Sequence, residues 1–134
     1  MYAIGRLLHL RYIEKEPRLL ATIKNPYPTM TTVIAITHPF EKLCPMSGEP
    51  QVGSTVSIRY IARETLLETK SVRAFLASFI NENPYAIRDL EEAVQFIART
   101  CSEAIYADVT VEAHYILASS VMDVTATSRY PYAY

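Results

Sequence analysis

The sequence predicts an α+β fold in which an antiparallel sheet carries two helices on one face. Two observations lead to this prediction. Segments of strand-like character, most of them alternating apolar and polar residues, lie at both ends of a central region whose apolar residues recur with the period of a helix. The expected order is therefore strand, strand, helix, helix, strand, strand. Two hairpins that flank a helix pair form an antiparallel sheet with one covered face.

The first hairpin is expected at residues 30–37 and 55–61. The earlier segment reads MTTVIAIT, a run of β-branched and apolar residues that favours a strand. In the later segment, Val56, Ile58 and Tyr60 alternate with polar residues. This alternation indicates a strand with one buried face.

Two helices are expected between the hairpins. After Glu68 the apolar residues fall on one helical face. They are Val72, Phe75, Leu76, Phe79 and Ile80. Residues 81–84 end this helix, and a second one begins near Ile87 with an apolar stripe of its own. That stripe consists of Leu90, Val94, Ile97, Ala98, Cys101 and Ile105.

The last hairpin and the chain ends complete the expected organisation. Alternation returns at residues 109–117, and a weaker strand is expected at 121–126. We interpret residues 1–134 as a single domain, with residues 1–29 as an N-terminal arm and 128–134 as a C-terminal tail. Open sheet edges favour pairing with other chains, so closure into a ring-like homo-oligomeric barrel is expected.

The composition is that of a folded protein, with 50% hydrophobic and 20% charged residues. A net charge of −1 provides no basic field, so nucleic acid is not expected as a partner. The sequence shows no secretory segment and no apolar run long enough to cross a membrane, and it has two cysteines. These features favour a cytoplasmic location. No metal site is expected.

One cysteine lies in turn-like sequence and the other on a helical stripe. Cys44 belongs to the segment FEKLCPMSGEPQ, where backbone amides of a tight turn and nearby cations lower a thiol pKa. The local sequence fits a nucleophile and an ordinary loop residue equally well. Cys101 lies on the apolar stripe of the second helix, which favours core packing.

Two segments carry a resemblance to a known family. PFEKLCPMSGEPQ, followed by LLETKSVRAFLASFIN, resembles the nitrile reductases of queuosine biosynthesis, the QueF family. That family shows a pattern close to F-T-x-L-C-P-x-T-G-Q-P-D and then E-S-K-S-L-K-x-Y-L-x-S-F-R-N. The resemblance extends over roughly residues 20–125. It implies the tunnelling fold, in which subunits of the order predicted above assemble into barrels.

The resemblance also implies a specific reaction. Members of this family reduce the nitrile of 7-cyano-7-deazaguanine to an aminomethyl group with NADPH. Cys44 matches the nucleophile that adds to the nitrile carbon and forms a covalent thioimide. Covalent catalysis of this kind divides one difficult step into easier ones.

Cofactor binding is implied for the segment that begins the first helix. Glu68, Lys70 and Ser71 match the family signature associated with the nicotinamide cofactor. The chain has no G-x-G-x-x-G loop. Lys70 and Arg73, in the first turn of a helix, are therefore candidates for holding phosphate groups. The alternative is a capped helix start with a solvated basic turn.

The remaining site residues depart from the family pattern. The glutamate that binds the polar edge of the purine-like ring is best matched by Glu91, with Glu82 as the second choice, and Leu90 replaces the histidine before it. The aspartate that donates a proton to the nitrile nitrogen is replaced by Gln51. Because residues two apart in an extended segment point to the same side, Glu49 is a candidate for that acid, with a solvated turn residue as the alternative.

Three functions remain open from the sequence. The first is an NADPH-dependent nitrile reductase, supported by the cysteine and cofactor segments together. The second is a relative that forms the same thioimide and passes it to ammonia, giving an amidine. The third is a deazapurine-binding or structural homologue without catalysis, which the replacements at positions 51 and 90 favour. The family's Arg-Gly-Gly near the last strand, here Ala118-Ser119-Ser120, also favours the third.

Overall fold

The computed structural model describes residues 20–131. In chain order its strands and helices are β1 (Thr22–Lys24), β2 (Val33–Pro39), β3 (Thr55–Ile61), β4 (Thr65–Leu67), α2 (Thr69–Asn81), α3 (Leu90–Ile105), β5 (Val109–Ile116) and β6 (Val121–Ser128). The predicted α+β order is confirmed, with two short strands in addition. No helix among these residues is long and apolar enough to cross a membrane. Residues 1–19 of the expected arm and 132–134 of the expected tail lie outside the described residues.

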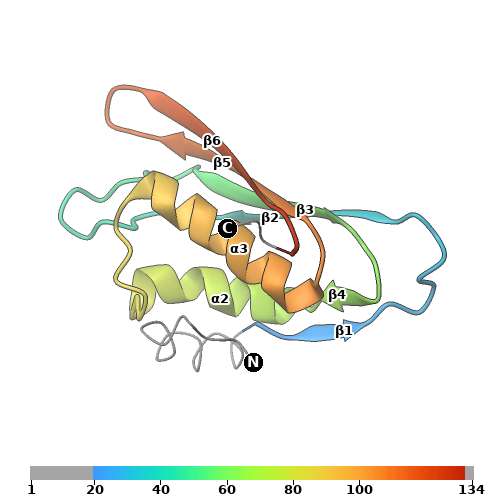
Figure 1. Ribbon diagram of the computed structural model, residues 1–134. Helices are drawn as coiled ribbons and strands as arrows, with labels where there is room; N and C mark the ends of the chain where they lie inside the picture. The colour runs from blue at the N-terminus through green and yellow to red at the C-terminus, as the bar shows by residue number, and fades with distance from the viewer. Residues whose placement is uncertain (1–19, 132–134) are drawn as a thin grey trace.

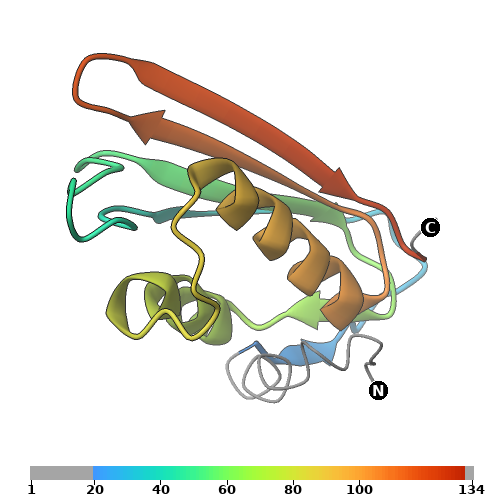
Figure 2. The ribbon, with the colours of Figure 1, turned by 60° about the vertical axis from the view of Figure 1, so that its left-hand side comes forward.

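Four strands form one antiparallel sheet in the order β2-β3-β5-β6. The register aligns Ile36, Ile58, Val111 and Ala126 across the sheet. Both helices cover this face, as Figures 1 and 2 show, which agrees with the prediction. The alternate side chains of the two central strands are buried beneath the helices, because residues two apart in a strand share a face.

The other face of the sheet is open and largely polar. Arg59 pairs with Glu112 at 3.3 Å, and His114 Nδ1 lies 2.7 Å from Asp123 Oδ1. These pairs join residues on neighbouring strands, as cross-strand pairing requires. They are exposed, so their contribution to stability is small.

Both helices begin at an acidic residue that caps the first turn. The Glu68 carboxylate accepts hydrogen bonds from the N–H groups of Lys70 at 3.0 Å and Ser71 at 2.8 Å. Asp89 accepts one from the N–H of Glu91 at 2.9 Å. These bonds satisfy amides that have no partner within the helix.

An aromatic cluster joins the helices to the sheet. The ring of Phe79, in α2, lies 5.6 Å from that of Phe40 and 6.0 Å from that of Phe96, measured between centroids. Phe40 in turn lies 6.3 Å from Tyr115 of β5. Phe79, Phe40 and Tyr115 are almost completely buried. Phe40 begins the loop that contains Cys44, so that loop starts from the centre of the core.

The structure differs from the prediction in several places. β2 covers Val33–Pro39 instead of the expected 30–37, and β6 extends to Ser128 instead of the expected end at 126. Ile80, expected on the apolar face of α2, is 37% exposed. β1 and β4 form a separate two-stranded sheet, so the stretch of the expected arm that begins at residue 20 is anchored to the domain. The second helix begins at Leu90 and not near Ile87. The Asn83 side chain binds both the N–H and the C=O of Ile87, which holds residues 83–87 in a non-helical loop. Helical structure starts only after the Asp89 cap.

Candidate active site around Cys44

Cys44 lies in a loop that closes on itself through backbone hydrogen bonds. The N–H of Phe40 donates to the carbonyl of Ser54 at 2.9 Å and closes the base of the loop. The N–H of Cys44 donates to the carbonyl of Glu49 at 3.0 Å, and its carbonyl accepts from Gly48 at 2.8 Å. Gly48 has a φ of +74°, which a glycine adopts without steric cost. The nucleophile candidate therefore sits in a defined turn.

Hydrogen-bond donors surround the partly exposed thiol. The hydroxyl of Ser47, followed by the backbone amides of Ser47 and Met46, lowers the pKa of Cys44 from its ordinary value. Partial burial acts in the opposite direction, and the positive charge of Arg88 adds a smaller lowering. All of the lowering groups stabilise the thiolate, which is the nucleophilic form. This environment favours the interpretation of Cys44 as a reactive residue.

Glu49 and Gln51 follow Cys44 on the returning side of the loop. The Glu49 carboxylate accepts a hydrogen bond from the N–H of Ala118 at 2.8 Å. The backbone N–H of Gln51 donates to the carbonyl of Ile116 at 2.8 Å, while its side chain is exposed. Both residues therefore tie the Cys44 loop to the end of β5 and the turn after it.

Glu91 lies in the exposed first turn of α3, at the same end of the molecule as the Cys44 loop. The Tyr115 hydroxyl donates to the carbonyl of Leu90 at 3.0 Å and holds this turn against the sheet. Burial, followed by the negative charges of Glu91 and Asp89, raises the pKa of Tyr115, so its hydroxyl stays a donor. Figure 1 shows the loop beside the start of α3.

A residue that the sequence prediction missed lies between these two elements. Arg88 Nη1 donates to the carbonyl of Leu43 at 3.2 Å, directly before the nucleophile candidate. Arg88 belongs to an irregular linker, where no periodicity marks a residue as inward or outward. No pattern in the sequence could have identified this contact.

The expected cofactor residues occupy the start of α2. The carboxylate of Glu68 is used as the helix cap, and the backbone amides of Lys70 and Ser71 lower the pKa of Glu68. The Ser71 hydroxyl binds the backbone of Ala21. Lys70 and Arg73 are exposed. The side chains of Glu68 and Ser71 are therefore already hydrogen-bonded within the chain. The exposed side chains of Lys70 and Arg73 could still contact a ligand.

Within one chain, this segment lies at the far end of α2 from the Cys44 loop. Phe79, in the last turns of the helix, contacts Phe40 at the base of that loop, whereas Ser71 contacts Ala21. Figure 1 shows the same separation, with the first turn of α2 next to β4 and its end near the loop. The structure thus brings Cys44, Glu49 and Glu91 to one end of the domain. The basic turn begins at the other end of α2, although burial and then the charge of Arg73 lower the pKa of His38, two residues before Phe40.

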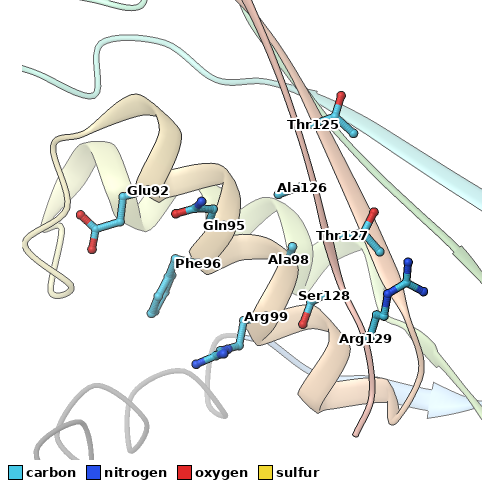
Figure 3. Close-up of a pocket in the computed structure, with 10 residues that line it drawn as sticks. All are labelled: Glu92, Gln95, Phe96, Ala98, Arg99, Thr125, Ala126, Thr127, Ser128 and Arg129. Atoms are coloured by element: carbon cyan, nitrogen blue, oxygen red, sulfur yellow. The ribbon is translucent and has the colours of Figure 1, made fainter. Parts of the chain in front are cut away.

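A cleft of about 760 Å³ runs between α3 and the edge strand β6 (Figure 3). Its lining residues are Glu92, Gln95, Phe96, Ala98, Arg99, Thr125, Ala126, Thr127, Ser128 and Arg129. The residues expected to carry the chemistry are not among them. In residues 20–131, no group of three or more His, Cys, Asp or Glu side chains is arranged to hold a metal ion.

Comparison with known proteins identifies relatives of the chain. No family model matches it. A reductase of Caldanaerobacter subterraneus is 35% identical over 98 residues, which cover 69% of this chain and 71% of that protein. Reductases of Syntrophobacter fumaroxidans and Synechococcus elongatus are 30% and 32% identical, over 66% and 67% of this chain. Matches to these last two span 55% and 49% of their length, so the chain covers about half of each. All three are described as NADPH-dependent 7-cyano-7-deazaguanine reductases. The chain therefore belongs to the family of NADPH-dependent 7-cyano-7-deazaguanine reductases.

Proposed function

We propose that the chain reduces the nitrile of 7-cyano-7-deazaguanine to an aminomethyl group with two equivalents of NADPH, through a thioimide on Cys44. The observation that carries this proposal is the partly exposed Cys44 thiol, held in a closed turn whose donors lower its pKa. Family membership supplies the substrate class. A small-molecule deazaguanine, not nucleic acid, is the proposed substrate.

The first step would be addition of the Cys44 thiolate to the nitrile carbon. The carbon–sulfur bond forms as one π bond of the nitrile opens, and the electron pair moves to nitrogen, which takes a proton. Glu49 is the proposed donor of that proton, since it lies in the same loop with its carboxylate partly buried. Its Oε2 accepts from Ala118, so the proton would be carried on Oε1. Gln51 can donate a hydrogen bond but not a proton.

Glu91 is the proposed binding residue for the polar edge of the deazaguanine ring. It lies in the first turn of α3, exposed and close to Tyr115, and its carboxyl group interacts with that of Asp89. The Tyr115–Leu90 hydrogen bond holds this turn in place. A carboxylate suits the N–H groups of a guanine-like edge, because an ionised acceptor makes strong hydrogen bonds.

Lys70 and Arg73 are the proposed contacts for the phosphate groups of NADPH. Both are exposed cations on one turn, which fits a polyanionic cofactor, although the amides of that turn are already used by Glu68. When bound, the nicotinamide would supply the hydrides that reduce the thioimide and then the imine. The chain's own residues would hold the substrate and protonate nitrogen.

A ring of subunits is part of the proposal. β2 and β6 are open edges of the four-stranded sheet, and the cleft beside β6 offers space for a neighbouring subunit. Since one chain separates the basic turn of α2 from Cys44, a neighbouring subunit is the natural source of the cofactor contacts. A complete active site would then require the oligomer.

One observation favours the second candidate, an amidine-forming relative that uses the same thioimide. The side chains of Glu68 and Ser71 are fully accounted for by the helix start and by Ala21, without any cofactor. Retention of these residues is therefore weaker support for reduction than the sequence alone suggests. The thioimide step is common to both candidates.

Mass spectrometry of the intact protein tests the proposal. The protein is incubated with 7-cyano-7-deazaguanine alone and then with NADPH added. The proposed reductase gains the mass of one substrate per chain, and NADPH removes that mass and releases the aminomethyl product. An adduct that persists with NADPH but is released by ammonia would favour the amidine-forming candidate. No adduct under any condition would favour a binding protein.

A further inference from the structure

Arg88 joins two parts of the candidate site that are distant in the sequence. It directly precedes Asp89, the cap of α3, and its Nη1 donates to the carbonyl of Leu43 at 3.2 Å. Leu43 is the residue before Cys44. One side chain thus connects the turn of the nucleophile to the start of the helix that carries Glu91.

Both ends of this connection are fixed independently. The Leu43 side chain is fully buried, so its carbonyl has a defined position. On the other side, Asn83 holds the backbone of Ile87, and the Tyr115 hydroxyl holds the carbonyl of Leu90. Because both segments are held in place by other contacts, the hydrogen bond between them fixes the position of one relative to the other.

The charge of Arg88 also acts at the thiol. Its guanidinium is among the groups that lower the pKa of Cys44, after the donors of Ser47 and Met46. The Arg88 side chain is exposed, so salt weakens this effect. Arg88 therefore acts on the Cys44 turn in two ways: its hydrogen bond holds Leu43, and its charge favours the thiolate.

We propose that Arg88 is a positioning residue that clamps the Cys44 turn onto the start of α3 and so sets the separation between the thiol and Glu91. The part that concerns Glu91 rests on the proposed function, and the clamp itself rests on the Leu43 contact. A guanidinium suits this task because its planar set of donors binds a carbonyl while its delocalised charge remains near the thiol. Lysine would keep the charge but offers a less defined geometry.

Alkylation of Cys44 tests the clamp without any substrate. The rate of reaction with iodoacetamide is measured against pH by peptide mass spectrometry, which separates Cys44 from Cys101. The variants are Arg88→Ala, Arg88→Lys and, as a matched control, Arg63→Ala at an exposed arginine between β3 and β4. Circular dichroism confirms that each variant is folded.

The expected result is a displaced pH profile. Arg88→Ala should react about twofold to threefold more slowly at pH 7 and reach its full rate at higher pH, since the guanidinium is the smallest of the groups that lower the pKa of Cys44 and its lost hydrogen bond is to Leu43, not to the thiol. Arg88→Lys should recover part of the rate, and Arg63→Ala should match the unmodified protein. An Arg88→Ala profile identical to that of the unmodified protein would overturn the inference. So would a uniformly slower reaction at all pH values that lysine does not improve.

A second measurement separates this inference from the proposed function. The rate of adduct formation with 7-cyano-7-deazaguanine should fall further in Arg88→Ala than the alkylation rate, because the adduct also requires the correct position of Glu91. Equal losses in the two rates would overturn the role of Arg88 in spacing. If the unmodified protein forms no adduct, the proposed function fails, while the alkylation profile still decides whether Arg88 clamps the turn.

Discussion

Hydrogen-bond donors and a cation near the Cys44 thiol lower its pKa, which is the property that the proposed nucleophile requires. The Ser47 hydroxyl makes the largest contribution to its lowered pKa, and Arg88 the smallest of those that favour the thiolate. Cys101, in contrast, is completely buried in α3, as its place on the apolar stripe predicted. Only the first of the two has an environment suited to nucleophilic chemistry.

Ser47→Ala should slow alkylation of Cys44 at pH 7 by about threefold to tenfold, which corresponds to the net contribution of one ordinary hydrogen bond. The sign follows from the pKa: loss of a donor to the thiolate raises the pKa of Cys44, so less thiolate is present at neutral pH. At high pH both proteins are fully ionised and their rates should converge. The iodoacetamide rate against pH is the measurement, with Ser57→Ala on the open sheet face as control. Rates that differ equally at every pH would contradict this account.

Loss of the proposed proton donor, Glu49, should slow formation of the substrate adduct. Glu49→Gln should slow single-turnover formation of the substrate adduct about a hundredfold or more, the size expected for loss of a positioned acid. Glu41→Gln is the matched control, because Glu41 is a carboxylate of the same loop that also accepts a backbone hydrogen bond, from Gly53 at 3.3 Å. An unchanged rate in Glu49→Gln, together with a large gain in Gln51→Asp, would show that the chain lacks its acid.

At the scale of elements, α2 links the core to the loop of the nucleophile. Phe79 is completely buried against Phe40, while Ile80, the next residue, is more than one third exposed. The helix therefore presents one face to the aromatic cluster and the other to solvent. This packing fixes the base of the Cys44 loop.

Phe79→Ala should lower the free energy of unfolding by about 3–5 kcal/mol, because it leaves a cavity among four aromatic rings. Ile80→Ala, one position along, should change it by less than about 1 kcal/mol. Urea unfolding followed by circular dichroism measures both. Similar losses in the two variants would contradict the assigned orientation of α2.

Periodicity predicted the elements that are long enough to show it. β3, α2, α3 and β5 carry clear apolar repeats, and the structure confirms them. β1 and β4 have three residues each, too few to display a period, and their pairing depends on segments far apart in the chain. The same limit applies to Arg88, whose partner is 45 residues away. The turn around Cys44 was predicted because turn chemistry is local, but its proposed role as nucleophile came only from the resemblance of its segment to the family motif.

In the whole molecule as described from residue 20 to 131, no further strand pairs with the two edges of the four-stranded sheet. β2 and β6 end the four-stranded sheet, and the cleft between α3 and β6 extends along one of these edges. In the proposed ring a neighbouring subunit occupies this edge. The same ring would let a neighbouring subunit supply the proposed cofactor contacts to Cys44.

Sedimentation velocity should therefore find a species larger than the 15.2 kDa chain. Gln95→Trp, which places a bulky ring in the cleft, should shift it towards the monomer and reduce NADPH oxidation in parallel. Glu64→Trp, at an exposed residue outside the cleft lining, is the control and should assemble normally. A protein that is monomeric at all concentrations and still oxidises NADPH would contradict the need for a neighbouring subunit.

A covalent bond between Cys44 and the nitrile carbon of 7-cyano-7-deazaguanine would raise the mass of the intact protein, so the mass is measured after incubation with that compound. The unmodified protein and Cys101→Ala should each gain the mass of one substrate per chain. Cys44→Ala should gain none, although its fold is unchanged by circular dichroism. A Cys44→Ala protein that still gains the mass of the substrate would contradict the account.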